Sequence, residues 1–308
     1  MPRFYLPQLP NQGELALPES IVRHIHVLRL QAGDEIVLFD GQGMRVAATL
    51  QQVEKRKAAC TIGSVLESDS ESPLQIHLIQ AVSSGERMDF TLQKSVELGV
   101  ASITPVLSER CVVRLQGERA DKRVQRWQEI AVSACEQCGR DIVPPVRPIL
   151  RLADYLRQAA AEDGLKLLMS LQNTQSLREK QPAQRPVYLL IGPEGGWTAA
   201  EEQAAVEAGF EAITLGKRVL RTETASLAAI AAMQTLWGDF CCILGKTKSK
   251  AACTFAIMNV QAAFGCVRVY FFANPCSCRY GSTDGRTSQH RLLRICCVHV
   301  KSSLLRFW

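Results

Sequence analysis

The sequence predicts an α/β protein in which a mostly parallel sheet follows a small β-rich domain. From residue 74 to residue 240, short apolar segments of strand length alternate with segments of helical periodicity. This alternation is typical of a parallel sheet, because neighbouring parallel strands need a crossover connection. Residues 1–67 instead hold closely spaced strand-like segments, and the polar stretch ESDSESP (67–73) has the composition of a linker. We therefore expect one domain over residues 1–70 and a second over 74–240.

The first domain is expected to be a small β-barrel with one helix. EIVLFD (35–40) and MRVAATLQQV (44–53) are strand-like and flank DGQG, a glycine-containing hairpin signal. AACTIGSVL (58–66) predicts a third strand. PESIVRHIHVLRL (18–30) predicts a short helix, because proline favours the first helical turn and the apolar residues recur on one side.

The second domain is expected to alternate regularly between strands and helices. The predicted strands are LQIHLIQAV (74–82), ASITPVLS (101–108), KLLMS (166–170), PVYLLIG (186–192) and EAITLG (211–216). The predicted helices are MDFTLQKSVELG (88–99), ADKRVQRWQEIAVSACEQCG (120–139), TAAEEQAAVEAG (198–209) and TASLAAIAAMQTLW (224–237). The proline in ASITPVLS places that strand near an edge of the sheet.

Composition limits the compartment and the partners. Of the 308 residues, 47% are apolar and 21% are charged, which is typical of a globular protein. No apolar run is long enough to span a bilayer, and the first 20 residues lack the basic and apolar regions of a signal peptide. We expect a cytoplasmic protein without a membrane partner.

Residues 241–308 differ from the rest of the chain. They hold ten of the 36 Lys and Arg residues, one of the 30 acidic residues and eight of the 12 cysteines. CSC (276–278) and CCVH (296–299) could be imagined as zinc ligands, but the paired C-x2-C spacing of zinc sites is absent. The lone CEQCG (135–139) favours helix packing over a redox or metal site. The sequence predicts a poorly ordered basic tail and no metal.

Two loops combine glycine and polar residues after predicted strands. IGPEGGW (191–197) lets the backbone approach a ligand closely, because glycine has no Cβ. Thr198 and Glu201 then have the spacing of a capping box. LGKRVLRTETAS (215–226) follows the next strand, and Thr224 suits a helix N-cap. Neither loop matches the phosphate-binding or dinucleotide-binding glycine patterns. Both loops are expected to line one pocket at the same sheet edge.

These two loops resemble the paired C-terminal motifs of the RsmE family, whose members methylate N3 of a uridine in 16S ribosomal RNA. RHIHVLRLQAGDEI (23–36), RMDFTLQKSVELGVASITPVLSER (87–110) and KRVQRWQEIAVSACEQCGR (122–140) agree with this resemblance, which covers about residues 1–240. The resemblance implies a SPOUT-class fold with a deep trefoil knot near the C-terminus, a PUA-like barrel, bound S-adenosylmethionine and a homodimer. The implied partner is the 16S rRNA of the 30S ribosomal subunit.

The resemblance implies the cofactor residues, the chemistry of N3 methylation suggests catalytic roles, and basic residues suggest the RNA contacts. The expected S-adenosylmethionine site comprises Met169, Leu190, Ile191, Gly192, Glu194, Gly195, Gly196, Leu215, Gly216, Val219, Leu220, Thr222, Thr224 and Ala225. Arg221 is expected to stabilise negative charge on a uracil oxygen, and Glu223 to accept the N3 proton or orient Arg221; Glu223 could instead only complement the helix dipole. The expected RNA contacts are Arg3, Arg23, Arg29, Arg87, Lys94, Arg110, Arg140, Lys217 and Arg218.

Two alternatives remain open from the sequence. A ribose 2′-O-methyltransferase of the same fold class would share the cofactor loops but modify a sugar hydroxyl. A non-catalytic RNA-binding protein could keep the fold without binding S-adenosylmethionine. The alanine-rich helix over 224–237 is compatible with close packing either at a dimer interface or within one subunit.

Overall fold

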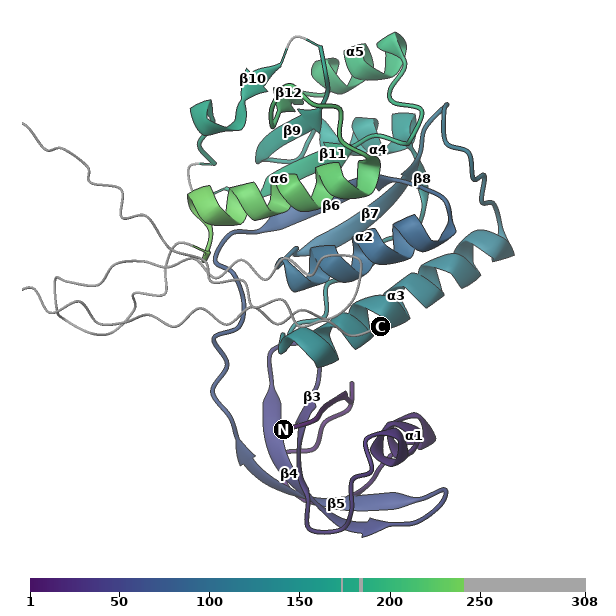
Figure 1. Ribbon diagram of the computed structural model, residues 1–308, viewed down its shortest axis with the longest axis vertical. Helices are drawn as coiled ribbons and strands as arrows, with labels where there is room; N and C mark the ends of the chain where they lie inside the picture. The colour runs from purple at the N-terminus through teal and green to yellow at the C-terminus, as the bar shows by residue number, and fades with distance from the viewer. Residues whose placement is uncertain (173, 183–184, 241–308) are drawn as a thin grey trace, which may run out of the picture. The chain divides into compact units, whose positions relative to one another are not determined.

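The computed structural model describes residues 1–172, 174–182 and 185–240, which form two sheets with their helices (Figure 1). The predicted tail, residues 241–308, lies outside the described residues, as do the cysteines there that could be imagined as zinc ligands. In the described part of the chain, no helix is long and apolar enough to cross a membrane.

The N-terminal sheet has five strands in the order β1-β3-β4-β5-β2. Its elements are β1 (Arg3–Tyr5), β2 (Gly13–Ala16), α1 (Glu19–Val27), β3 (Glu35–Phe39), β4 (Arg45–Val53) and β5 (Ala58–Val65). β1 pairs with β3 in parallel, and the other pairs are antiparallel. Ile21, Val22 and Ile25 of α1 are buried in one cluster with the strands, because they lie on one side of the helix. The predicted helix and three strands are thus confirmed, whereas β1 and β2 were not predicted.

The second sheet has seven strands in the order β10-β12-β9-β11-β6-β7-β8, and every pairing in it is parallel. Its strands are β6 (Ile76–Ala81), β7 (Ser102–Leu107), β8 (Leu150–Arg151), β9 (Leu165–Met169), β10 (Gln175–Ser176), β11 (Val187–Ile191) and β12 (Glu211–Thr214). The predicted parallel sheet is confirmed. The strand with Pro105 is β7, next to the short edge strand β8, as its proline predicts.

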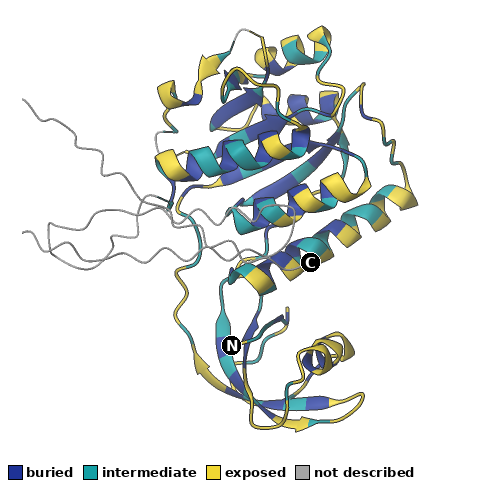
Figure 2. Ribbon diagram, in the orientation of Figure 1, coloured by how far each residue is buried: buried dark blue, intermediate teal, exposed yellow. Residues whose placement is uncertain are grey.

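Helices cover both faces of this sheet (Figures 1 and 2). They are α2 (Gly85–Glu97), α3 (Glu118–Cys138), α4 (Leu152–Ala159), the 3-10 turn Leu177–Glu179, α5 (Ala199–Glu207) and α6 (Thr222–Trp237). Alternate residues of β11 face opposite sides: Leu189 packs in the cluster with α2, α3 and α6, and Leu190 packs in the cluster with α4 and α5. Both faces are therefore buried, which explains why the strands are almost continuously apolar.

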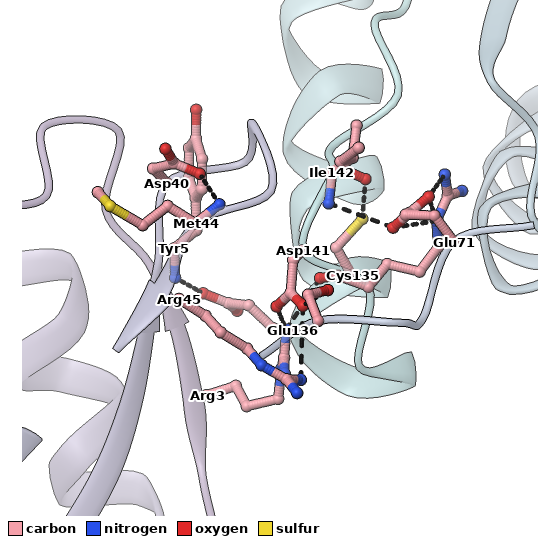
Figure 3. Close-up of polar contacts among 12 residues, drawn as sticks. Arg3, Tyr5, Asp40, Met44, Arg45, Glu71, Cys135, Glu136, Asp141 and Ile142 are labelled. Carbon is pink, nitrogen blue, oxygen red and sulfur yellow. Dashed lines mark hydrogen bonds and ion pairs between the residues drawn. The ribbon is translucent and has the colours of Figure 1, made fainter. Parts of the chain in front are cut away.

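Asp141, after α3, is fully buried and forms ionic contacts with the N-terminal sheet (Figure 3). Its carboxylate lies 2.5 Å from the Arg3 guanidinium and 3.4 Å from that of Arg45, and it also accepts from the Ser68 hydroxyl. Arg3 donates to the Arg140 carbonyl as well, at 2.9 Å. We call Asp141 with Arg3, Arg45 and Ser68 the Asp141 clamp. The clamp ties β1, β4 and the linker to the segment that follows α3.

Arg140 is the neighbour of the clamp and is itself buried, with 6% of its surface exposed. Its guanidinium donates to the Val96 and Val100 carbonyls and to the Glu71 carboxylate, at 2.6–3.3 Å. The expected RNA contact of Arg140 therefore has no support in the structure, because its donors already bind protein acceptors. The same holds for Arg3, whose side chain is 13% exposed and paired with Asp141.

Candidate active site

The candidate site lies where β9, β11 and β12 end. These strands are neighbours in the parallel sheet, in the order β12-β9-β11, so their carboxyl ends meet at one edge. Met169 ends β9, the glycine loop Gly192–Trp197 follows β11, and a second loop, Leu215–Arg221, follows β12. Open α/β sheets bind ligands at this end of their strands. The structure thus brings the two sequence motifs to the same edge, as predicted.

Trp197 folds the glycine loop back onto the neighbouring strand. Its indole N–H donates to the Met169 carbonyl at 3.2 Å, and its ring covers Gly192. A Cβ on Gly192 would lie 3.1 Å from the indole, which is closer than an ordinary contact. Any larger residue here would have to push the Trp197 ring aside by a few tenths of an ångström. A Cβ on Gly195 would similarly lie 3.0 Å from the Arg110 Cβ. At both positions the close neighbour of the glycine is another part of the chain.

Contacts of Glu194 and Arg110 join the glycine loop to the start of α2 and to the segment after β7. Glu194 accepts from the Ser84 backbone N–H at 3.1 Å, at the start of α2, and lies 3.5 Å from the Arg87 guanidinium. Arg110 donates to the Gly195 and Trp197 carbonyls, both at 3.1 Å. The sequence predicts that Glu194 contacts the cofactor and that Arg110 contacts RNA. The structure gives each a contact that fixes the loop.

The glycine loop ends in the predicted capping box. The Thr198 hydroxyl accepts from the Glu201 backbone N–H at 3.2 Å, and the Glu201 carboxylate accepts from the Thr198 backbone N–H at 3.0 Å. Two unpaired donors of the first turn are satisfied in this way. Glu201 also accepts from the Glu109 N–H at 2.8 Å, so α5 is joined to the segment after β7. A local sequence signal therefore fixes where the loop stops.

The second loop is more exposed than the first. Gly216 has φ +148°, a backbone conformation that favours glycine. Lys217 and Arg218 are exposed, and Val219 is 77% exposed, an unusual position for an apolar side chain. Leu215 and Leu220 pack against the sheet core. The loop thus presents cations and one apolar side chain at the edge where β9 and β11 end.

Helix α6 begins earlier than the sequence predicts. Its first residue is Thr222, with Arg221 at the N-cap position, so the expected cap at Thr224 is wrong. The reason is a tertiary contact: the Thr222 hydroxyl donates to the Gly192 carbonyl at 2.5 Å. This bond joins the start of α6 to the first loop. Thr224 is exposed, and Ala225 is buried in the core cluster.

Arg221 and Glu223 occupy different environments. Arg221 is exposed. Glu223 is half-buried, and one oxygen of its carboxylate is buried without any hydrogen-bond partner among the described residues. No hydrogen bond or ion pair joins the two side chains in the part of the chain that the structure describes, so the expected orientation of Arg221 by Glu223 is not seen. A buried acceptor without a partner is costly unless a ligand supplies the donor. Glu223 is therefore the better placed of the two to meet a ligand donor.

The other cations expected at RNA are mostly exposed. Arg23 and Arg87 lie on α1 and α2, and Arg29 lies just after α1. Lys94 is half-buried and pairs with Glu97 at 2.7 Å. The exposed cations among them, Arg23, Arg29 and Arg87, and those of the second loop, Lys217 and Arg218, can reach a phosphate backbone.

Sequence reasoning missed several residues that build the site. Gln80 of β6 is fully buried and hydrogen-bonds to Thr222, and Ser226 of α6 hydrogen-bonds to Gln80. The available signal was a glutamine within an apolar strand.

A cleft of about 480 Å³ lies between the segment after β7, α4 and α5, and no residue of either loop lines it. We place the candidate site at the loops because their polar and backbone groups converge there.

The described cysteines do not form a reactive or metal-binding group. Burial raises the pKa of the Cys135 thiol to about 12 and that of Cys60 to about 11. The pKa of Cys138 is also raised, chiefly by burial. In residues 1–240, apart from the three that are not described, no group of three metal-ligating side chains is found.

Comparisons with known proteins place this chain in a family. Residues 70–234 match an RNA methyltransferase domain, and residues 17–63 match an RNA methyltransferase PUA domain. Ribosomal RNA small subunit methyltransferase E of Buchnera aphidicola is 32% identical over 78% of this chain and 95% of its own length. The protein of that name from Bacillus subtilis is 30% identical over 76% of this chain and 96% of its own.

Solved structures agree. A ribosomal RNA small subunit methyltransferase E from Neisseria gonorrhoeae, bound to S-adenosylmethionine, is 57% identical, has a TM-score of 0.74, and covers 78% of this chain and 99% of its own. A putative methyltransferase from Legionella pneumophila with the same cofactor is 40% identical, has a TM-score of 0.73, and covers 77% and 98%. The parallel α/β fold of the SPOUT class and the PUA-like domain are thereby confirmed, while strand order alone does not establish the expected knot. This chain belongs to the ribosomal RNA small subunit methyltransferase E family, the RsmE family that its motifs resemble.

Proposed function

We propose that this protein transfers a methyl group from S-adenosylmethionine to N3 of a uridine in the 16S rRNA of the small ribosomal subunit. The observation that carries the proposal is the convergence of the two loops at the ends of β9, β11 and β12, linked by the Thr222 hydroxyl. Relatives of the same family that are bound to S-adenosylmethionine support the cofactor. Ribosomal subunits are cytoplasmic, so the proposed compartment is the cytoplasm.

The residues at the loops fit this cofactor. Backbone groups of Gly192–Gly196 and Leu215–Leu220, with Met169 between them, would hold adenine and ribose, and the exposed Val219 offers an apolar surface for a ring. The unpartnered Glu223 oxygen offers an acceptor for a ligand N–H or O–H. No phosphate-binding glycine pattern is present, and the cofactor has no phosphate. When bound, it supplies an electrophilic methyl group on sulfur.

The protein must then position uracil and accept the proton that leaves N3. Uracil N3 loses its proton, a bond forms between N3 and the methyl carbon, and the bond from that carbon to sulfur breaks. In-line placement supplies most of the rate. Arg221, exposed at the N-cap of α6, would stabilise the negative charge that develops on a uracil oxygen. Glu223 would hold the N3 proton at its buried oxygen as the proton leaves nitrogen.

We also propose a homodimer, formed partly by α6. The helix is alanine-rich, and Ala228, Ala231 and Ala232 are only half-buried in the single chain. Leu236 on the same helix is 43% exposed. Small residues permit close approach of a second helix. Light scattering of the purified protein should give twice the mass of one chain; a mass of one chain at micromolar concentration would exclude this proposal.

A methylation assay tests the function directly. Small subunits that lack the modification are incubated with the protein and labelled S-adenosylmethionine, and the methylated nucleoside is identified by mass spectrometry. N3-methyluridine is the expected product. A 2′-O-methylated nucleoside would instead establish the ribose methyltransferase alternative. An absence of S-adenosylmethionine binding in calorimetry would favour a non-catalytic RNA-binding protein.

A further inference from the structure

A fully buried chain of hydrogen bonds lies directly beneath the two loops. Gln80, in the central strand β6, is completely buried, as is Ser226 of α6. The Gln80 amide nitrogen donates to the Thr222 hydroxyl at 3.0 Å and to the Ala81 carbonyl at 3.1 Å. The Ser226 hydroxyl donates to the Gln80 oxygen at 2.6 Å. Both hydrogens and the oxygen of the carboxamide are therefore engaged.

The direction of each hydrogen bond in this series follows from its last acceptor, the Gly192 carbonyl. The Gly192 carbonyl can only accept, so the Thr222 hydroxyl must give it its single proton, at 2.5 Å. Thr222 must then accept from a donor, which requires the nitrogen of Gln80 to face it. The oxygen of Gln80 consequently faces Ser226, which can donate. A carboxamide meets both requirements at once, whereas an ionised carboxylate lacks the donor and an apolar side chain lacks both.

The Gly192 carbonyl is the first peptide group after β11, and so the chain of bonds fixes where the glycine loop begins. The same bond fixes the first turn of α6, where the second loop ends. The glycine loop is also held by the bond from Trp197 to Met169 and by the contacts of Glu194 and Arg110. The spacing between the two loops therefore depends on the bond from Thr222 to Gly192, which Gln80 supports, while Trp197 ties the first loop to β9.

We propose that Gln80 is a positioning residue that sets the distance between the two loops of the methyl-donor site, acting through the Thr222 hydroxyl on the Gly192 carbonyl. This inference rests on the proposed function for its consequence, since a wider or mobile gap would bind S-adenosylmethionine less well. Its structural part, the order of the glycine loop, does not depend on any ligand.

The chain offers a matched control at the other end of α6. Gln234 is also fully buried, donates to the Leu98 carbonyl at 2.9 Å and accepts from the Ser72 hydroxyl at 2.7 Å. Its partners lie at the C-terminal end of α2 and in the linker, away from both loops. Gln80→Leu and Gln234→Leu each leave buried polar partners unpaired, so both are expected to lower thermal stability. Only Gln80→Leu should disturb the loops.

The experiment measures hydrogen exchange in the ligand-free protein and S-adenosylmethionine affinity by calorimetry. In Gln80→Leu, amides of residues 192–197 and of the first turn of α6 are expected to exchange faster, and affinity to fall about ten-fold, which corresponds to about 1.4 kcal/mol. Gln234→Leu is expected to keep wild-type exchange at those amides and wild-type affinity. Unchanged exchange at residues 192–197 in Gln80→Leu, or unchanged affinity, would overturn the inference.

A second pair of variants decides the same point if Gln80→Leu does not fold. Thr222→Val keeps the shape of the side chain but removes the donor to Gly192, and Thr222→Ser keeps the hydroxyl. Faster loop exchange in Thr222→Val with restoration in Thr222→Ser supports the proposal, and equal exchange in both contradicts it. A wild-type protein that bound no S-adenosylmethionine would count against the proposed function alone, because the exchange data would still report the role of Gln80.

Discussion

Neutralising Asp141 should destabilise the whole folded body. Asp141→Asn keeps the size of the side chain but leaves two guanidinium groups without their counter-ion, at positions where Arg3 is 13% exposed and Arg45 23% exposed. Removing one partner from a buried ion pair costs about 3–5 kcal/mol. The partial exposure of the two arginines favours the lower end, about 3 kcal/mol. For a folded body of this size, that loss corresponds to a fall in Tm of about 6–12 °C.

The control for this prediction is an aspartate that also contacts two arginines, but at the surface. Asp154 also contacts two arginines, Arg151 and Arg157, but both of these are 77% exposed. Because water screens such pairs, Asp154→Asn should leave Tm nearly unchanged. Differential scanning calorimetry of the two variants beside wild type makes the comparison. Equal small shifts for Asp141→Asn and Asp154→Asn would refute the reasoning that the Asp141 clamp stabilises the fold.

Further predictions concern catalysis, the loop and alkaline stability. Arg221→Ala should reduce single-turnover methylation more than it weakens S-adenosylmethionine binding, and equal losses would make Arg221 a cofactor-binding residue instead. Thr198→Ala removes the capping box and should lower the free energy of unfolding in urea by about 1 kcal/mol, with Thr198→Ser close to wild type; equal losses in both would show that the hydroxyl is not needed. Folding raises the pKa of Cys135 from its usual 9.0 to about 12. The unfolded chain therefore loses that proton first, so stability should fall as pH rises above 9. Cys135→Ala should show a smaller fall between pH 8 and pH 10 than wild type, and an identical fall would exclude this cause.

The sequence predicted those features whose cause is visible in a short segment or in a periodic pattern of apolar residues. The capping box needs only Thr198 and Glu201 in one turn, and the alternation of apolar strands with helices follows from burial on both faces of the sheet. The start of α6 was predicted wrongly, because the hydroxyl that decides it is bound to Gly192, a residue of another loop. Sequence alone could not weigh that tertiary bond against the capping preference of Thr224.

The buried charges were hidden for a related reason. Arg3 and Arg140 look like surface cations until Asp141 and Glu71 are placed against them, and Asp141 is far from Arg3 in the sequence. Helix α4 was not predicted, since its eight residues have helical periodicity over barely two turns. The two loops were predicted from their glycine and polar residues after strands, and the resemblance assigned them to the cofactor. Dividing their residues into those that hold the loop and those that face a ligand needed the structure.

The order of strands in the large sheet has a consequence for how the protein folds. The central pair, β6 and β11, joins a strand that ends at Ala81 to one that begins at Val187. β9 and β12 then complete the part of the sheet whose carboxyl ends carry both loops. Contacts so distant in sequence form slowly, because the loop-closure entropy must be overcome before they stabilise the chain. β6 can pair early with β7, but the helices α2, α3 and α4 emerge during synthesis well before β6 can meet its other partner, β11. The end of the sheet that carries both loops is consequently among its last parts to form, so partly synthesised chains expose apolar strands until β11, β12 and α6 have emerged.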